Sequence, residues 1–83
     1  MIKLLIGEAV KIRIKGLCDD RNITINKLAT ISGVTQSTLN NIVSGRNNST
    51  TISTIKKLCD GLEISVCDFF DSEIFLQLEQ EIE

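Results

Sequence analysis

The residues of this sequence best suited to molecular recognition are four polar side chains within six positions: Gln36, Ser37, Asn40 and Asn41. On a helix with 3.6 residues per turn, this spacing groups them in one row. Their amide and hydroxyl groups donate and accept hydrogen bonds without carrying charge, which suits the base edges in a DNA groove, and Gln and Asn pair well with adenine. The row predicts a surface that reads duplex DNA and favours A/T-rich sites. The alternative is an ordinary solvated helix face.

Two short helices joined by a turn must position this polar row, within the stretch 24–45. Thr24 is expected to cap the first of them, over about 25–31, because a threonine hydroxyl accepts a hydrogen bond from an N–H group in the first helical turn. Gly33 supplies a positive φ after this helix. Thr35 caps the second helix, which ends near 43. The expected inward-facing residues are Leu28, Ala29, Leu39, Ile42 and Val43.

The remaining periodic segments complete a small all-α core. A helix over 6–21 is predicted by apolar residues at helical spacing: Ile6, Val10, Ile14 and Leu17. A further helix is expected over about 52–61, and a short helical turn follows Ser65. Eighty-three residues make one small domain. We therefore expect a compact five-helix domain over 1–71.

The last segment, 72–83, is an acidic amphipathic tail. Four apolar residues share one side of it if it is helical: Ile74, Phe75, Leu78 and Ile82. That side can form a dimer contact, or it can pack back on the core of its own domain. The loop 46–52 is a second candidate for the dimer contact.

Charge is divided sharply along the chain, although the formal net charge is only −2. Residues 1–57 hold all nine Lys and Arg against three acids, a net of +6. Residues 58–83 hold eight acids and no base, a net of −8. No acid occurs from Ile23 to Lys57, so a polyanion should meet the first part of the chain and be repelled by the second.

Several residue types that other functions need are absent. The chain has no His, Tyr or Trp. Without His, the usual neutral-pH general base and the commonest metal ligand are missing, so we expect no enzyme, no metal and no cofactor. Three cysteines without metal spacing, Cys18, Cys59 and Cys67, indicate free buried thiols in a reducing cytoplasm. No apolar run approaches the roughly 18 residues of a membrane span.

One set of residues keeps a common register from Leu28 to Ser65. Its members are Leu28-Ala29, Gly33-Val34-Thr35, Leu39, Ile42, Gly45, Leu62, Ile64 and Ser65. In this register the chain resembles the Cro/cI-type (XRE-type) helix-turn-helix family over about 18–70. The resemblance implies a lambda-repressor-like fold that binds duplex DNA with its third helix in the major groove.

The resemblance also implies which residues contact DNA. Gln36, Ser37 and Asn41 match positions that touch base edges, and Asn40 lies beside them. Phosphate contacts, through side chains or helix N-termini, are implied for Thr24, Lys27, Thr35, Thr38, Ser44, Arg46, Asn47 and Asn48. Lys56 and Lys57 are further candidates.

Three features depart from the family pattern. Ile25 stands where the family often has a phosphate-binding Gln. Cys18 and Val43 replace a common Arg–Glu ion pair, and we expect their side chains to touch, because an apolar pair leaves no buried charge without its mate. Glu63 stands where the family usually has Gly after the fourth helix, so a positive φ there would cost about 1 kcal/mol.

Together these observations predict a sequence-specific, double-stranded DNA-binding transcriptional regulator, more specifically a repressor that occludes a promoter. Proteins of this fold usually bind as dimers to half-sites about 34 Å apart. We therefore expect a homodimer, at least on DNA. The alternative is a protein-interaction or antitoxin-like module, in which the acidic C-terminal third docks on a basic partner.

Overall fold

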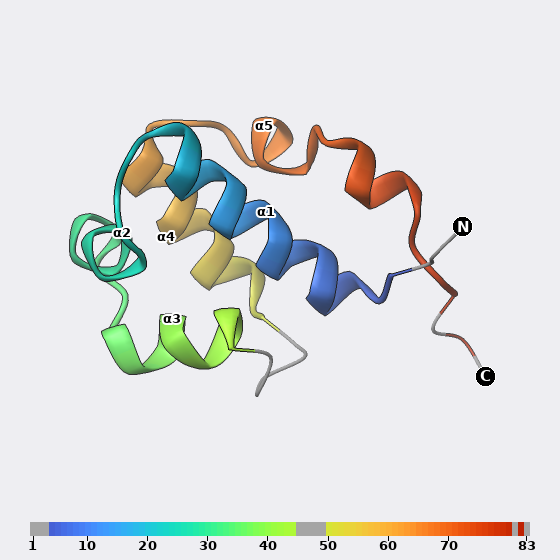
Figure 1. Ribbon diagram of the computed structural model, residues 1–83, viewed down its shortest axis with the longest axis horizontal. Helices are drawn as coiled ribbons and strands as arrows, with labels where there is room; N and C mark the ends of the chain where they lie inside the picture. Colours follow the sequence, from blue (N-terminus) through green and yellow to red (C-terminus); the bar gives the residue numbers. More distant parts are fainter. Residues whose placement is uncertain (1–3, 45–49, 81, 83) are drawn as a thin grey trace.

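Five α-helices and one short 3-10 helix make up the part of the chain that the computed structural model describes, residues 4–44, 50–80 and 82. In chain order they are α1 (Ile6–Asp20), α2 (Ile25–Ser32), α3 (Gln36–Val43), α4 (Ile52–Leu62), α5 (Val66–Phe70) and η1 (Glu73–Leu76) (Figure 1). The predicted five-helix, all-α fold is confirmed, and the predicted helix bounds agree to within one residue. Within these ranges, no helix has the length and apolar character needed to cross a membrane.

Hydroxyl groups at helix N-termini fix where four of the helices begin. The capping residues Thr24, Thr35, Thr51 and Ser65 each accept a hydrogen bond from the backbone N–H three residues later. The donor–acceptor distances are 3.0–3.1 Å. Each bond satisfies one of the N–H groups that a helix start leaves without an intrahelical partner. The helix bounds are therefore encoded locally, by the residue that precedes each helix.

A single apolar core lies between α1, α2, α3 and α4, and Phe69 of α5 closes it. The largest fully buried side chains are Phe69, Ile14, Leu28, Leu39, Leu58 and Leu62. Cys18 belongs to this core and Val43 packs against it, which agrees with apolar residues replacing an ion pair. The direct contact between these two side chains stays a prediction.

The three cysteines are free thiols, but they do not share one environment. Cys18 and Cys59 are buried, and burial raises the pKa of both thiols, with the neighbouring Asp19 and Asp60 carboxylates adding to the effect. Cys67 is exposed on α5. The expectation of a buried thiol was therefore wrong for Cys67, because α5 is only five residues long and turns just part of its surface to the core.

Two glycines meet strict spatial requirements around α2. Gly33 ends α2 in the left-handed conformation, with φ 68°. Gly61 of α4 lies against the end of α2, where an added Cβ would stand 2.3 Å from Ser32 Oγ and 3.1 Å from the Ile31 carbonyl oxygen. Because real Cβ atoms do not approach other atoms so closely, α2 and α4 can pack this tightly only with Gly at 61.

Non-glycine residues also adopt positive φ at two helix ends. Glu63 follows α4 with φ 60° and ψ 40°, the left-handed conformation in which a residue other than Gly carries strain. Asn22 follows α1 with φ 55°. Asn visits this region more readily than Glu, because its short amide can hydrogen-bond locally. The strain is therefore expected mainly at Glu63.

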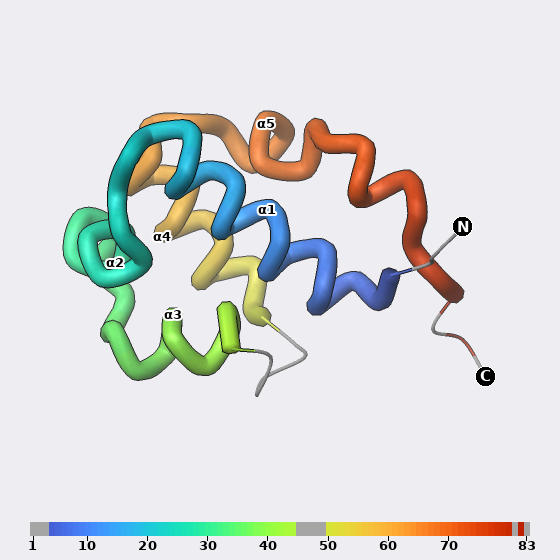
Figure 2. The backbone as a smooth tube through the Cα atoms, in the orientation of Figure 1, coloured from blue at the N-terminus to red at the C-terminus, as the bar shows by residue number. Residues whose placement is uncertain are grey.

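The tail begins as a helix and then changes conformation. After η1, the Leu4 N–H donates to the Gln77 carbonyl (2.9 Å), and the Glu79 N–H donates to the Leu4 carbonyl (2.8 Å). These bonds make a parallel bridge between Leu4 and Leu78. Figure 2 shows the two ends of the described chain meeting at this point. The expected helical tail is therefore confirmed for η1 alone, because beyond it the backbone bonds to Leu4 instead of to its own carbonyls.

Aromatic rings and one arginine connect α5 to the rest of the molecule. The Phe70 ring lies 5.0 Å from Phe69 and 4.9 Å from Phe75, measured between ring centroids, and both pairs are close to edge-on. Arg13 of α1 donates from Nε to the Phe69 carbonyl (2.7 Å) and from Nη2 to the Asp68 carbonyl (2.8 Å). Carbonyls at a helix C-terminus lack intrahelical partners, so Arg13 caps α5.

Candidate nucleic-acid interface

Helix α3 divides its side chains cleanly between core and solvent. Leu39 and Ile42 are buried, whereas Gln36, Ser37 and Asn40 are exposed. Hydrogen bonds with other described side chains do not occupy these three polar groups. The outward side of α3 is therefore a row of free, uncharged donors and acceptors, as the sequence predicts.

Asn41 differs from the other three members of the row. It was expected to be exposed, but it is half-buried. The reason lies in its position, immediately before the buried Ile42 in the last turn of the helix. Asn41 consequently stands at the edge of the polar row, and the residue as a whole is less exposed than Gln36 and Asn40.

A pair of threonines at the start of α3 holds the helix in place. The Thr35 hydroxyl oxygen accepts a hydrogen bond from the Thr38 N–H (3.1 Å), and its proton is donated to Thr38 Oγ1 (2.8 Å). Thr35 therefore uses both its acceptor and its donor within the helix start. Thr38 keeps its own hydroxyl proton, so of these two predicted phosphate contacts Thr38 is the one with a donor to offer.

The other residues predicted to contact phosphates differ in the hydrogen bonds that their side chains already make. Thr24 and Lys27 are both exposed at the start of α2, where Thr24 Oγ1 accepts from the Lys27 N–H and retains its hydroxyl proton. Ser44 is exposed, but its hydroxyl donates to the Asn41 carbonyl (3.3 Å). Ile25 packs against the core, as expected of an apolar residue at that position. Three further predicted contacts lie outside the described residues: Arg46, Asn47 and Asn48.

The lysines of α2 and α4 differ in their ion pairing. Lys27, Lys56 and Lys57 are all exposed, but Lys56 forms an ion pair with Asp60 one turn further along α4. Figure 1 shows α3 along one edge of the molecule, and α5 and η1 toward the opposite edge, with α1 and α4 between them. The fold thus keeps α5 and η1, which carry Asp68 and Glu73, away from α3, and this favours approach of a polyanion to that helix.

The apolar residues expected to form one side of the tail are split by the fold. Phe75 packs against the core, and Ile74 and Leu78 are half-buried. Ile82 is 84% exposed, and Leu76, which the sequence pattern did not single out, is 85% exposed. The alternative interpretation of the tail, in which it packs back on the core of its own domain, therefore holds for Phe75.

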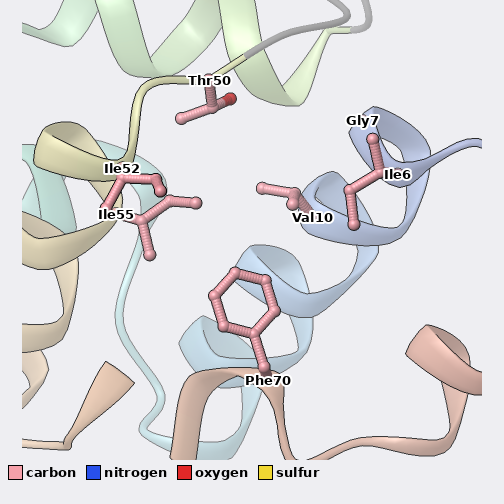
Figure 3. Close-up of a pocket in the computed structure, with 7 residues that line it drawn as sticks. All are labelled: Ile6, Gly7, Val10, Thr50, Ile52, Ile55 and Phe70. Atoms are coloured by element: carbon pink, nitrogen blue, oxygen red, sulfur yellow. The ribbon is translucent and has the colours of Figure 1, made fainter. Parts of the chain in front are cut away.

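Two features of the structure could not be predicted from the sequence. The role of Arg13 as the cap of α5 had no sequence signal, because its partners lie 55 and 56 residues away. An apolar pocket beside the start of α4 (Figure 3) was also not anticipated, because Ile52 fits the apolar spacing of this helix in the sequence but is 79% exposed in the structure.

Comparisons with known proteins agree with this geometry. The Cro/C1-type HTH DNA-binding domain family matches residues 13–73. Prophage Lp1 protein 11 has a similar solved structure, with TM-score 0.75 and 45% identity, over 86% of this chain and 92% of that chain. An HTH_3 family transcriptional regulator from Vibrio cholerae gives TM-score 0.74 and 30% identity, over 84% of this chain but 39% of that longer one.

A third solved structure and the family match complete the comparison. The clp gene regulator ClgR from C. glutamicum shares the fold, with TM-score 0.76 and 23% identity, over 94% of this chain and all of that chain (100%). No curated protein gives a significant match. The family match covers well over half of the sequence, and the five helices follow the lambda-repressor-like arrangement. The chain belongs to the Cro/C1-type helix-turn-helix DNA-binding family of transcriptional regulators.

Proposed function

We propose that this protein is a sequence-specific regulator that reads the major groove of duplex DNA with α3. The observation that carries the proposal is the free polar row on a helix whose opposite side is locked into the core by Leu39 and Ile42. Eight residues of α-helix are about 12 Å long, and the major groove is about 12 Å wide. A rigid helix of this size can present three or four side chains to successive base pairs.

The side chains of the row have separate roles in this proposal. Gln36 and Asn40 offer exposed amides that can pair with adenine, and Ser37 offers a hydroxyl that can serve several bases. Asn41 contacts the groove from the edge of the row. Thr24, Thr38 and Lys27 bind phosphates and set the register, together with the remaining predicted contacts.

Repression by promoter occlusion and binding as a homodimer complete the proposal. One domain offers on the order of 600–1,000 Å² of DNA interface, which limits its affinity for a single half-site. Two copies on adjacent half-sites double that interface. A small regulator can then repress transcription simply by occupying the promoter.

Selection of binding sites from random duplex DNA tests the proposal most directly. The full chain should enrich one motif at low salt, with two related half-sites. On that motif, Gln36→Ala and Asn40→Ala should each weaken binding by about 1–3 kcal/mol and relax preference at one base pair. Gln80→Ala, which removes an exposed amide from the tail, is the matched control and should bind like the parent chain.

Loss of a phosphate contact should change the affinity for every duplex and the salt dependence of binding, and it should leave sequence preference unchanged. Lys27→Ala should weaken binding to all duplexes alike and lower the salt slope by about one. Enrichment of no motif, or parental binding by both row variants, would reject α3 as the reader of sequence.

The acidic C-terminal third supports a second candidate function. Two of its short helices, α5 and η1, lie on the side of the molecule away from α3 (Figure 1) and carry Asp68 and Glu73, so this surface could dock on a basic protein. An interaction or antitoxin-like module of this kind would bind no duplex in a salt-dependent way. It would instead co-purify with its partner, and Gln36→Ala would leave that association intact.

A further inference from the structure

Two threonine hydroxyls at the start of α3 are hydrogen-bonded in a defined direction. Thr35 Oγ1 accepts from the Thr38 N–H (3.1 Å) and donates its own proton to Thr38 Oγ1 (2.8 Å). A hydroxyl group has one proton and two acceptor lone pairs. Because Thr38 Oγ1 receives the Thr35 proton, the proton of Thr38 must point away from Thr35. Both residues are exposed, so this proton is available at the surface beside the start of α3.

Hydroxyl groups elsewhere in the α2–α3 pair use their protons differently. Thr30 Oγ1 donates to the Asn26 carbonyl, four residues earlier in α2 (3.1 Å). Ser44 Oγ donates to the Asn41 carbonyl, three residues earlier (3.3 Å). A helical Ser or Thr commonly turns back in this way, and its proton is then used within the helix. Thr38 adopts the opposite arrangement, in which its oxygen accepts and no carbonyl of the described residues takes its proton.

Comparable residues at two other helix starts do not present a proton of fixed direction. Thr51 and Thr54 at α4 are also hydrogen-bonded through their hydroxyls (2.9 Å), but either oxygen can be the donor. At α5, the residue that corresponds to Thr38 is Asp68, whose carboxylate accepts from the Ser65 N–H (3.4 Å). A carboxylate repels an anion, whereas the first turn of α3 contains no acid. Of these three helix starts, that of α3 combines an acid-free first turn with a donor of fixed direction.

We propose that Thr35 is a positioning residue for DNA binding and that its hydroxyl holds the Thr38 hydroxyl in the orientation that donates to a DNA phosphate. This role rests on the proposed function, in which Thr38 binds a phosphate. Thr35 acts through Thr38 and not through its own hydroxyl, because the Thr35 proton is already used. An ionised phosphate oxygen only accepts hydrogen bonds, so it requires a donor whose proton is free.

The arrangement favours binding because Thr38 is ordered before DNA arrives. A threonine in a helix divides between two χ1 rotamers, since Oγ1 can also bond to a backbone carbonyl. The bond from Thr35 selects one of them. Binding then loses less side-chain entropy, and losses of this kind reduce affinity. A hydroxyl that already accepts one hydrogen bond is also polarised, which makes it a stronger donor in the next.

Affinities of full-chain variants for the selected duplex test this role. Thr35→Gly removes the hydroxyl, while glycine remains an acceptable N-cap residue. Affinity for all duplexes should fall about three- to tenfold, as expected for one weakened hydrogen bond. Thr35→Ser keeps the donor and should bind like the parent. Ser65→Gly, which makes a corresponding change at the N-terminus of α5, is the matched control and should also bind like the parent.

A double-mutant cycle separates positioning from helix stability. Thr38→Val keeps the shape of the side chain but removes the donor, so affinity should fall about tenfold. In the Thr38→Val background, Thr35→Gly should cause no further loss, because the hydroxyl on which Thr35 acts is absent. All variants are compared at a temperature at which circular dichroism shows them folded. An equal loss in both backgrounds would overturn the inference, since Thr35 would then act independently of Thr38.

NMR of the free protein tests the orientation without DNA. Three-bond couplings of the Thr38 methyl group should indicate one χ1 rotamer in the parent and in Thr35→Ser, and averaging between rotamers in Thr35→Gly. One rotamer in all three proteins would also overturn the inference, while leaving α3 as the reader of sequence. If the parent chain binds no duplex, the proposed function fails, and the couplings alone decide whether Thr35 orients Thr38.

Discussion

The pair of helices α2–α3 and the C-terminal tail are held in place by different kinds of contact. Thr24 and Thr35 cap the two helices with bonds to residues three positions away, and Gly33 makes the turn between them. The tail depends on contacts outside itself, because Leu78 bridges to the distant Leu4 and Phe75 packs against the core.

The difference explains what each region can offer to a binding partner. In α3 the core takes the apolar side chains and the caps take the N-terminal backbone groups, so the polar side chains remain free. In the tail, Phe75 packs against the core, and the backbone of Gln77 and Glu79 is hydrogen-bonded to Leu4. These groups are therefore not available to a binding partner. The helix pair thus presents its polar side chains for recognition, whereas the described contacts of the tail stabilise its own domain.

The largest expected effect on stability concerns the close contact between α2 and α4 at Gly61. Gly61→Ala should lower the free energy of unfolding by about 1–3 kcal/mol, because the new methyl group would overlap Ser32 at the α2–α4 contact. Ser32 Oγ is buried and finds no hydrogen-bond partner among the described residues. Removing it with Ser32→Ala should therefore restore part of the loss. Denaturant unfolding monitored by circular dichroism measures both.

Gly16→Ala is the matched control for that substitution. Gly16 is also helical, but an added Cβ there meets no atom within 4 Å. Alanine should raise stability by about 0.5–1 kcal/mol through its better helix propensity. Equal effects at positions 16 and 61 would mean that α2 and α4 do not approach closely.

The second-largest expected effect concerns the contribution of tail packing to stability. Phe75→Ala should cost about 1–2 kcal/mol, because a half-buried ring and its contact with Phe70 are lost. Leu76→Ala should change stability by less than about 0.5 kcal/mol, since Leu76 is almost fully solvated. Both variants should bind DNA like the parent at temperatures where they are folded. A loss of DNA affinity in folded Phe75→Ala would show that the tail does more than stabilise the domain.

The third effect concerns the cap of the reading helix. Thr35→Ala should cost about 1 kcal/mol, because the Thr38 N–H loses its acceptor. Thr35→Ser keeps the hydroxyl and should retain most of the stability. Thermal unfolding of the three proteins ranks them, and identical midpoints for Ala and Ser would contradict the capping role.

These contrasts also explain which parts of the structure could be predicted from the sequence. Caps such as Thr35 and the glycine at 33 act within a few residues, so their effect on helix bounds is visible in the sequence itself. The periodicity of Leu39 and Ile42 likewise identifies the buried side of α3. The polar row followed from these two signals, except for Asn41, whose burial depends on the packing of its neighbour.

Contacts between distant segments left no such signal. The spacing of Ile74, Phe75 and Leu78 suits a helix, but the bridge to Leu4 competes for the same backbone groups and prevails after Leu76. The capping of α5 by Arg13 is equally invisible in sequence, because a basic residue on a helix surface usually faces water. Tertiary hydrogen bonds decided both cases.

The smallest effect compares the ends of α2 and α4, which use the same left-handed conformation with different residues. Gly33 adopts φ 68° without strain, whereas Glu63 adopts φ 60° against a steric cost of about 1 kcal/mol. Glu63→Gly removes that cost, but it adds about 0.5–1 kcal/mol of conformational entropy to the unfolded chain. The net result should be a gain in stability of up to about 0.5 kcal/mol, measured by denaturant unfolding. Asn22→Gly should gain less, because asparagine tolerates this region, and a larger gain at position 22 than at position 63 would show that Glu63 is not the strained residue.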